Sequence, residues 1–425
     1  MSALPLRVLR GRLLQPHATE PRFTLWPDAL LHLDDAGRIT SVVAAPPGCP
    51  TPETWPGAVL VPGFVDAHLH FPQTRILGSA SGPLLPWLQT SVFPEESRFA
   101  DRAYAEPVAA TFCERMLRQG TTMAAIYSSS HPGATDALFA ELDRRGMRAL
   151  AGLTWMNRGA PDALVRDTAD ALAATEALVE RWHNHDGGRL RVCVTPRFAL
   201  SCDEPMLRAA AGLAERHGLW IQTHLSENPD ELAFTAQAFP GARDYLDVYE
   251  SFGLVNERTI LAHCIHLSDE EWGRLAARRA VIAHCPDSNF FLGSGCMPLA
   301  RALAEGVPVA LGTDVGAGRT FSLRRVAASA YDASLVVGAP VSPEVLLWLA
   351  TRGGAVALGL GDQAGCVAPG YAADLVALEA PPSGTTGGAA LSTLIDALLF
   401  QHDAGPALAT VIQGRVRWGA SPTRS

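Results

Sequence analysis

The chain has 425 residues, a hydrophobic fraction of 48% and a formal net charge of -9. This length exceeds what one hydrophobic core usually supports, so we expect one large domain and one smaller unit. The negative charge argues against nucleic acid as a partner, because no positive field is available to hold a phosphate backbone. No apolar run reaches the roughly 18 residues of a membrane span, and the N-terminal stretch lacks the apolar core of a secretory signal, which predicts a soluble cytoplasmic protein with no membrane partner.

Two residue types narrow the chemistry further. The sequence contains no lysine, so all 34 basic residues are arginine. This excludes a Walker A phosphate loop, a Schiff base on lysine and a carboxylated lysine that bridges two metal ions. The eight cysteines show no C-x-x-C spacing. We therefore expect buried thiols in a reducing compartment rather than a zinc ribbon or a redox pair.

Strand-like patterns occur at both ends of the chain. Residues 6–14 and 29–44 form one pair of runs, and Asp34-Asp35-Ala36-Gly37 supplies the turn inside the second. Residues 373–380 and 408–419 are again β-like and are separated by a glycine-rich stretch. These patterns predict one small β-sandwich domain that is built from residues 1–60 and 366–425.

Between the termini, short apolar runs alternate with amphipathic helical patterns, which is typical of repeated βα units around a parallel sheet. Helices are expected at 135–146 and 206–218, each closed by a glycine, and Ser268–Glu271 has the pattern of a capping box. The pattern predicts a TIM-like (β/α)8 barrel over residues 61–365, with its active site at the carboxyl ends of the strands. The eight runs cover residues 58–68, 121–128, 147–155, 190–198, 219–227, 259–266, 280–288 and 308–316.

Ionisable side chains stand at the ends of several of these runs. His68 and His70 lie two apart on the first run, so they point to the same face of a strand. Such a pair can hold a metal ion, although taken alone an ordinary surface or core pair explains it better. His224 and Glu227 end the fifth run, where one could bind a metal and the other transfer protons. An unligated histidine beside a solvated glutamate explains that pair about as well.

The prediction of a metal rests on the whole set of residues. His263 ends the sixth run and Asp314 ends the eighth, whereas strands with apolar cores seldom finish in ionisable groups. Histidines and a carboxylate at one end of a barrel form a nitrogen-rich set of donors. Such a set suits one zinc ion per chain, with iron as the alternative, and it leaves a position open for water.

Four motifs in this order and on these strands resemble the amidohydrolase superfamily, and the resemblance covers nearly the whole chain. In the mononuclear deaminase branch it implies that His68, His70, His224 and Asp314 bind the metal and that His263 orients the attacking water. The missing lysine agrees, since the binuclear hydantoinase-like branch usually needs a carboxylated one. The motifs are PGFVDAHLH (62–70), THLSE (223–227), AHC (262–264) and GTDVGAG (312–318).

Longer motifs resemble the guanine deaminase family in particular. In that family the residues that match Gln73, Arg197 and Phe198 hold the purine. Arginine offers only donors and suits O6 or N7, while a glutamine amide can both donate and accept. The motifs are HFPQT (70–74), PRF (196–198), ARDYLDVY (242–249) and DSNFFLGSG (287–295). The full set of expected substrate contacts is His70, Phe71, Pro72, Gln73, Arg197, Phe198, His224 and Asp314.

The resemblance also implies a mechanism in which Glu227, His263 and Asp314 are the catalytic residues. A bound metal would lower the pKa of its water toward ~7. Asp314 with His263 would take the proton and aim the nucleophile at C2 of guanine. Glu227 would protonate N3 and then pass a proton to the departing amine, so that xanthine and ammonia form. The resemblance further implies a homodimer.

Two alternatives remain at this point. An enzyme of the same class could act on another ring, such as 8-oxoguanine, a pterin or a triazine. A barrel that has lost catalysis could serve as a scaffold, although all the expected metal ligands are present. The small zinc deaminases are a different class, and their H-x-E and P-C-x-x-C signatures are missing.

Other residues near the expected site receive plainer interpretations. His131, His266 and His284 are predicted to be hydrogen-bonded structural histidines. Trp87 and Trp155 could border the pocket or pack in the core. Tyr331 and Asp332 are left without a role. Residues 401–405 replace an acidic stretch that the family pattern leads us to expect, which bears on the choice of substrate.

Overall fold

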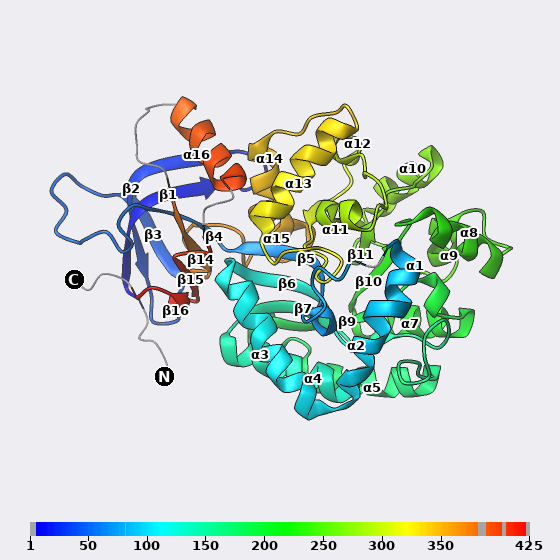
Figure 1. The fold of residues 1–425 in the computed structure, drawn as a ribbon. Helices are drawn as coiled ribbons and strands as arrows, with labels where there is room; N and C mark the ends of the chain where they lie inside the picture. Colours follow the sequence, from blue (N-terminus) through cyan, green and yellow to red (C-terminus); the bar gives the residue numbers. More distant parts are fainter. Residues whose placement is uncertain (1–5, 81, 381–387, 402–404, 422–425) are drawn as a thin grey trace.

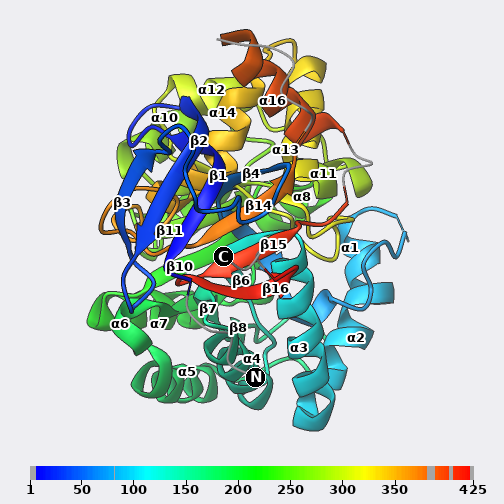
Figure 2. The ribbon, with the colours of Figure 1, turned by 90° about the vertical axis from the view of Figure 1, so that its left-hand side faces the viewer.

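A computed structural model describes residues 6–80, 82–380, 388–401 and 405–421, and it contains two main sheets (Figure 1). The first sheet combines strands from both ends of the chain, as Figure 2 shows by the blue and red strands lying in one sheet. Its order is β16-β15-β14-β4-β1-β2-β3. The strands are β1 (Val8–Pro16), β2 (Phe23–Leu33), β3 (Ile39–Ala44), β4 (Ala58–Pro62), β14 (Leu375–Glu379), β15 (Ala409–Ile412) and β16 (Arg415–Gly419).

The turn between β2 and β3 forms as predicted. The Asp34 side chain accepts hydrogen bonds from the amides of Ala36 and Arg38 at 2.9 and 2.8 Å. Gly37 has a φ of 74°, in the left-handed region that favours glycine. Aspartate and glycine therefore perform the two tasks that this turn requires.

The first predicted run contains two strands instead of one. β4 belongs to the terminal sheet, and β5 (Phe64–His70) begins the barrel one residue later. Gly63 joins them, and a Cβ at this position would lie 2.0 Å from Oγ1 of Thr122. Only glycine allows the chain to pass so close to β6. The predicted boundary at residues 60 and 61 falls inside β4, and the division into domains stays a prediction.

The second sheet is the predicted barrel of eight parallel strands. Its order is β13-β12-β11-β10-β9-β7-β6-β5, with the short β8 paired to β9. Beyond the last strand, the Asp314 amide donates to the His68 carbonyl at 2.8 Å and the His70 amide donates to the Val315 carbonyl at 2.7 Å. These bonds join the first strand to the chain that leaves the last one. The remaining strands are β6 (Thr121–Tyr127), β7 (Arg148–Gly152), β8 (Thr154–Trp155), β9 (Leu190–Pro196), β10 (Trp220–Leu225), β11 (Thr259–His263), β12 (Val281–His284) and β13 (Val309–Leu311).

Helices surround the barrel (Figure 1). The predicted caps are present, because Gly146 and Gly218 end α4 and α7 with positive φ and Ser268 with Glu271 forms a capping box on α10. The helices are α3 (Arg102–Arg118), α4 (Pro132–Arg145), α5 (Thr168–Trp182), α6 (His185–Gly188), α7 (Glu204–His217), α8 (Pro229–Ala238), α9 (Tyr245–Glu250), α10 (Asp269–Arg278), α11 (Pro286–Phe291), α12 (Leu299–Ala304), α13 (Leu323–Val336), α14 (Pro343–Trp348), α15 (Gly354–Ala357) and α16 (Gly388–Phe400).

A helical stretch between β5 and α3 lies against the carboxyl end of the barrel. We call residues 84–100 the mouth segment. It consists of α1 (Leu84–Trp87), a π-helical turn (Leu88–Val92), α2 (Phe93–Ser97) and a short 3-10 turn. Most of its apolar side chains pack in one cluster with Phe198 and Leu292, which follow β9 and α11; those side chains are Leu84, Trp87, Leu88, Val92 and Phe93. Burial of this face holds the segment over the strand ends.

Two further observations complete the fold. In the described part of the chain, no helix has both the length and the apolar character that a bilayer crossing requires. All eight cysteines are free thiols, and six of them are buried. Burial raises the pKa of several of them, for example Cys264 and Cys285. The prediction of buried thiols therefore holds for these six, whereas Cys49 and Cys296 are only partly buried.

Candidate metal and substrate site

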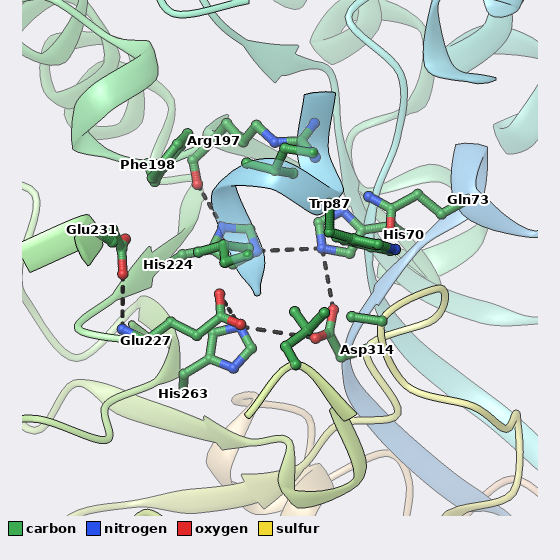
Figure 3. Close-up of a pocket in the computed structure, with 14 residues that line it drawn as sticks. His70, Gln73, Trp87, Arg197, Phe198, His224, Glu227, Glu231, His263 and Asp314 are labelled. Atoms are coloured by element: carbon green, nitrogen blue, oxygen red, sulfur yellow. Dashed lines mark hydrogen bonds and ion pairs between the residues drawn. The ribbon is translucent and has the colours of Figure 1, made fainter. Parts of the chain in front are cut away.

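Three histidines and a carboxylate, His68, His70, His224 and Asp314, converge where β5, β10 and β13 end. Figure 3 shows His70, His224 and Asp314 facing one another at this place. The Nε2 atom of His70 lies 3.2 Å from that of His68 and 3.3 Å from that of His224. Oδ1 of Asp314 lies 3.3 Å from His68 Nε2 and 3.4 Å from His70 Nε2. His263 enters from β11, with its Nε2 3.9 Å from Oδ2 of Asp314. The structure thus brings together the residues that the sequence predicted as metal ligands.

The donor atoms form two overlapping groups that could each hold a metal ion. One group is His68, His70 and His224, and the other is His68, His263 and Asp314, with the atoms of each group within 4.8 Å of one another. Imidazole nitrogens with one carboxylate oxygen are a donor set that zinc and iron accept. The chemistry of the donors therefore fits a single divalent ion.

Hydrogen bonds on the far side of two histidines fix which ring nitrogen faces this centre. Nδ1 of His224 lies 2.6 Å from the backbone carbonyl of Arg197, and Nδ1 of His263 lies 2.9 Å from Oδ1 of Asn289. A carbonyl can only accept, so each Nδ1 carries the proton and each Nε2 keeps its lone pair. Asn289 is 1% exposed, and its part in this arrangement was not predicted from the sequence.

Burial sets the protonation of the centre. It lowers the pKa of His68 and His224 and brings that of His70 to about 4. Burial acts to raise the pKa of Asp314, but hydrogen bonds from His68 and His70 outweigh it and hold that pKa well below its usual range. Neutral imidazoles and an ionised carboxylate are the forms that bind a metal.

Glu227 differs from Asp314 in its protonation. Burial, and then the charges of Asp314 and Glu231, raise its pKa well above the usual range. Its Oε2 lies 3.4 Å from Nε2 of His263, and its Oε1 accepts a hydrogen bond from Ser294 at 3.4 Å. A buried carboxyl group whose pKa is raised in this way suits proton transfer.

The backbone is unusual at the same strand ends. Ser226, His263 and Asp314 all have φ between 49° and 73°, although none is a glycine. Residues without glycine's freedom take this left-handed conformation at a cost of order 1–3 kcal/mol each, and such residues cluster at functional sites. Three of them around one centre therefore support a functional role for this end of the barrel.

A pocket of about 390 Å³ opens beside the histidines. Trp87 borders the pocket and also packs in the apolar cluster of the mouth segment, whereas Trp155 is buried in the core and donates to Thr175. The lining residues are His70, Gln73, Leu84, Trp87, Leu88, Arg197, Phe198, His224, Glu227, Glu231, His263, Leu292, Asp314 and Ala317.

Two of the expected substrate contacts do not border this pocket. Phe71 and Pro72 follow β5 in a 3-10 turn, and both are buried. The Phe71 ring packs in the core, with its centroid 5.1 Å from that of Phe99 and 5.6 Å from that of Phe112. The turn directs this side chain away from the opening, so the structure does not support the predicted contact. Gln73, at the end of the turn, does reach the pocket.

The other histidines are placed as follows. His266 is hydrogen-bonded as predicted, because its Nε2 lies 2.8 Å from the Ser294 carbonyl. The prediction is wrong for His284, which is fully buried with no hydrogen-bond partner for either ring nitrogen among the described residues. Burial lowers its pKa to about 3, so the ring is neutral. For His131, Nε2 likewise has no partner within the described chain.

The remaining sequence predictions concern residues outside the pocket. Tyr331 packs against Phe400 of α16, with ring centroids 5.1 Å apart, and Asp332 is exposed. Neither belongs to the pocket lining. Within the unusual stretch 401–405, positions 402–404 lie outside the described residues.

Comparison with known proteins agrees with this geometry. The model of the amidohydrolase family matches residues 59–417. A probable guanine deaminase from Deinococcus radiodurans is 43% identical over 398 residues, which span 90% of either chain. Guanine deaminase from Escherichia coli is 41% identical over 324 residues, which span 76% of this chain and 73% of that one.

Solved structures of guanine deaminases are also similar to this chain. The Escherichia coli guanine deaminase superimposes with a TM-score of 0.90 at 35% identity, covering 97% of this chain and 100% of that one. A guanine deaminase from C. acetobutylicum, with guanine bound in its active site, gives 0.89 at 30% identity and covers 97% and 99%. The predicted resemblance to guanine deaminases is confirmed. The chain therefore belongs to the amidohydrolase family.

Proposed function

We propose that the protein is a metal-dependent guanine deaminase, which converts guanine and water to xanthine and ammonia. One observation carries the proposal: the five polar residues that end strands β5, β10, β11 and β13 meet beside a pocket bordered by Gln73, Arg197 and Phe198. The relatives named as guanine deaminases are similar in sequence to this chain over most of their length. An inactive scaffold would have no reason to retain both this group of polar residues and the pocket beside it.

The ligands of the metal would be His68, His70, His224 and Asp314. We propose one zinc ion per chain, with iron as the alternative, because the donors are mainly imidazole nitrogens. When bound, the ion would supply an activated water molecule. All other steps fall to side chains of this protein.

Asp314 and His263 would direct the water. Oδ1 of Asp314 faces His68 and His70, whereas Oδ2 faces His263. One carboxylate oxygen is thus available to the metal and the other to a proton. Nε2 of His263 keeps its lone pair, because Asn289 holds the proton on Nδ1. These two acceptors would take the proton of the water as its oxygen attacks C2 of guanine.

Glu227 would carry protons to the ring and to the leaving group. Its raised pKa means that it can give a proton to N3 while the tetrahedral carbon forms. The proton that Asp314 and His263 took from the water would then pass through the Glu227 carboxylate to the amine, the bond from C2 to that nitrogen would break, and ammonia would leave. The hydroxyl left on C2 would give its proton to Glu227 as the carbonyl of xanthine forms, which restores the acid. The balance is guanine plus water giving xanthine plus ammonia.

The purine would lie between Gln73 and Arg197 on one side and the metal centre on the other. Both side chains border the pocket and are nearly fully buried. Phe198 and Trp87 give the pocket apolar walls on which a flat ring can pack. Buried hydrogen-bonding groups discriminate strongly against rings that leave them unpaired.

Ammonia release from guanine tests the proposal directly. The purified protein loaded with zinc should release ammonia from guanine, and a chelator should abolish the release until zinc is restored. 8-Oxoguanine, a pterin and an aminotriazine should be poorer substrates. A zinc-loaded, folded protein that releases no ammonia from guanine would refute the proposal, and a better rate with another ring would reassign the substrate.

Two finer proposals accompany the activity. We propose that the protein acts in the cytoplasm as a homodimer, on the strength of its resemblance to the guanine deaminase family. Light scattering after size-exclusion chromatography should give a mass of twice 45.1 kDa. A monomer at working concentration would contradict the dimer without affecting the proposed reaction.

A further inference from the structure

We propose that Glu96, a residue of the mouth segment that does not itself border the pocket, positions the two polar side chains that hold the purine. The inference rests on the proposed function, since it concerns how the substrate is held. Glu96 is 1% exposed and lies on α2. Its two carboxylate oxygens each bind a different member of the pocket lining.

The contacts of Glu96 are divided between its oxygens. Oε1 accepts a hydrogen bond from Nε2 of Gln73 at 2.9 Å, and Oε2 forms an ion pair with Arg197 at 2.7 Å. The partners follow β5 and β9, far apart in the chain. One carboxylate therefore sets the spacing between two groups that come from different strands.

This arrangement fixes the direction of the Gln73 amide. The nitrogen points to Glu96, and the oxygen accepts from the backbone amide of Gly316 at 3.1 Å. An amide held at both ends cannot rotate to exchange donor for acceptor. One further N–H and one further lone pair remain for a ligand. Glu96 thereby defines which edge of a ring the glutamine can recognise.

Glu96 has a similar effect on Arg197. The carboxylate engages one end of the guanidinium, and the ring of Phe93, also on α2, lies 5.6 Å from its central carbon. Two side chains of the same helix thus hold the guanidinium. Its other N–H groups remain for the pocket, which Arg197 borders. A planar group restrained in this way loses less freedom when it binds a purine.

The neighbouring glutamate shows what a purely structural role looks like. Glu95 is also buried, at 6% exposure, on the same helix. It accepts a hydrogen bond from Tyr104 at 2.5 Å and pairs with Arg98 at 3.3 Å, and neither partner borders the pocket. The two residues share type, helix and burial but differ in what they touch, so Glu95 is a matched control.

The test compares Glu96→Gln with Glu95→Gln. A glutamine at 96 has one acceptor oxygen, so it can satisfy only one of Gln73 and Arg197, and its amide nitrogen faces the other donor. We expect kcat/KM for guanine to fall about 30-fold, mainly through KM, as one buried group is left unpaired. Zinc content should not change. Glu95→Gln should keep kcat/KM within about threefold of wild type, as expected of a side chain away from the site.

A double-mutant cycle separates positioning from general destabilisation. If Glu96 acts through its two partners, adding Glu96→Gln to Gln73→Ala should cost much less than it does in the wild type. Additive losses, or equal losses in the two glutamate variants, would overturn the inference. If Glu96→Gln does not fold, Glu96→Asp keeps the charge and shortens the reach, and the same KM effect is expected. Wild-type protein inactive on guanine would instead refute the proposed function.

Discussion

The two halves of the candidate site are built in different ways. The half that we propose to bind a metal, the metal half, consists of side chains at the ends of four parallel strands, β5, β10, β11 and β13, so the barrel itself brings them together. The purine half depends on the mouth segment, where Glu96 and Trp87 meet Gln73 and Arg197 from the strand ends. The first half is a consequence of the fold, whereas the second needs a particular connection between two strands. Substitutions in the metal half should therefore lower kcat, and substitutions in the purine half should weaken the affinity for the substrate.

The largest effect is expected from removing a proposed metal ligand. His224→Ala should lower kcat by a factor of about 10³ or more, because metal-assisted activation of water contributes several kcal/mol. Zinc measured in the purified variant should fall well below one ion per chain. His217→Ala, an exposed histidine on α7, is the control and should retain both metal and activity. Full activity in His224→Ala would remove this residue from the metal half.

The next effect concerns proton transfer. Glu227→Gln removes the acid while keeping shape, so kcat should fall by about 10² to 10⁴. KM for guanine and zinc content should change little, since the side chain is proposed to act on the bound substrate. Steady-state kinetics and metal analysis check this. Unchanged turnover would exclude Glu227 from the mechanism.

Arg197 takes part in both halves, and one substitution can separate its two contributions. Its carbonyl orients His224, while its side chain borders the purine pocket. Arg197→Lys keeps the carbonyl and the charge but loses the planar fork. We expect kcat/KM to fall about 100-fold through KM, as for a lost charged hydrogen bond. Zinc content should remain normal, and loss of zinc would mean that the two halves are not separable here.

The smallest effect is expected at Asn289. Asn289→Ala removes the acceptor for Nδ1 of His263 and frees the ring to change its protonated nitrogen. Residues that hold a ligand from behind typically contribute about 10- to 100-fold in activity or metal affinity, and we expect the lower end. The readout is kcat at saturating guanine. A change confined to KM would place Asn289 in the purine half instead.

The sequence predicts the proposed metal ligands from a local pattern at the strand ends and from the resemblance to the family. A period of two on one strand and ionisable residues at the ends of apolar runs require no knowledge of distant contacts. The structure brings these residues together. The eight-stranded barrel and the sheet from both termini are predicted for the same reason, since βα alternation and turn residues are local features.

The purine half is harder to predict. Nothing local distinguishes Glu96 from Glu95, and the ion pair with Arg197 joins residues 101 positions apart. Phe71 was expected in the pocket, but the 3-10 turn after β5 sends it into the core. The sequence predicts a hydrogen-bond partner for His284, and the described residues provide none. The surroundings of this ring depend on how the neighbouring strands are placed, which the sequence alone does not show. These features depend on how separate elements pack.

The closure of the barrel has a consequence for biosynthesis. The bonds between His68 and Asp314 and between His70 and Val315 join the first barrel strand to the residues after the last. Among the proposed ligands, His68 and His70 stand at the start of the barrel sequence, His224 in its middle and Asp314 at its end. A chain still emerging from a ribosome can display the paired histidines of β5 long before it can offer the carboxylate. The complete set of proposed donors exists only after translation has passed β13, so capture of the proposed ion would belong to the last stage of maturation.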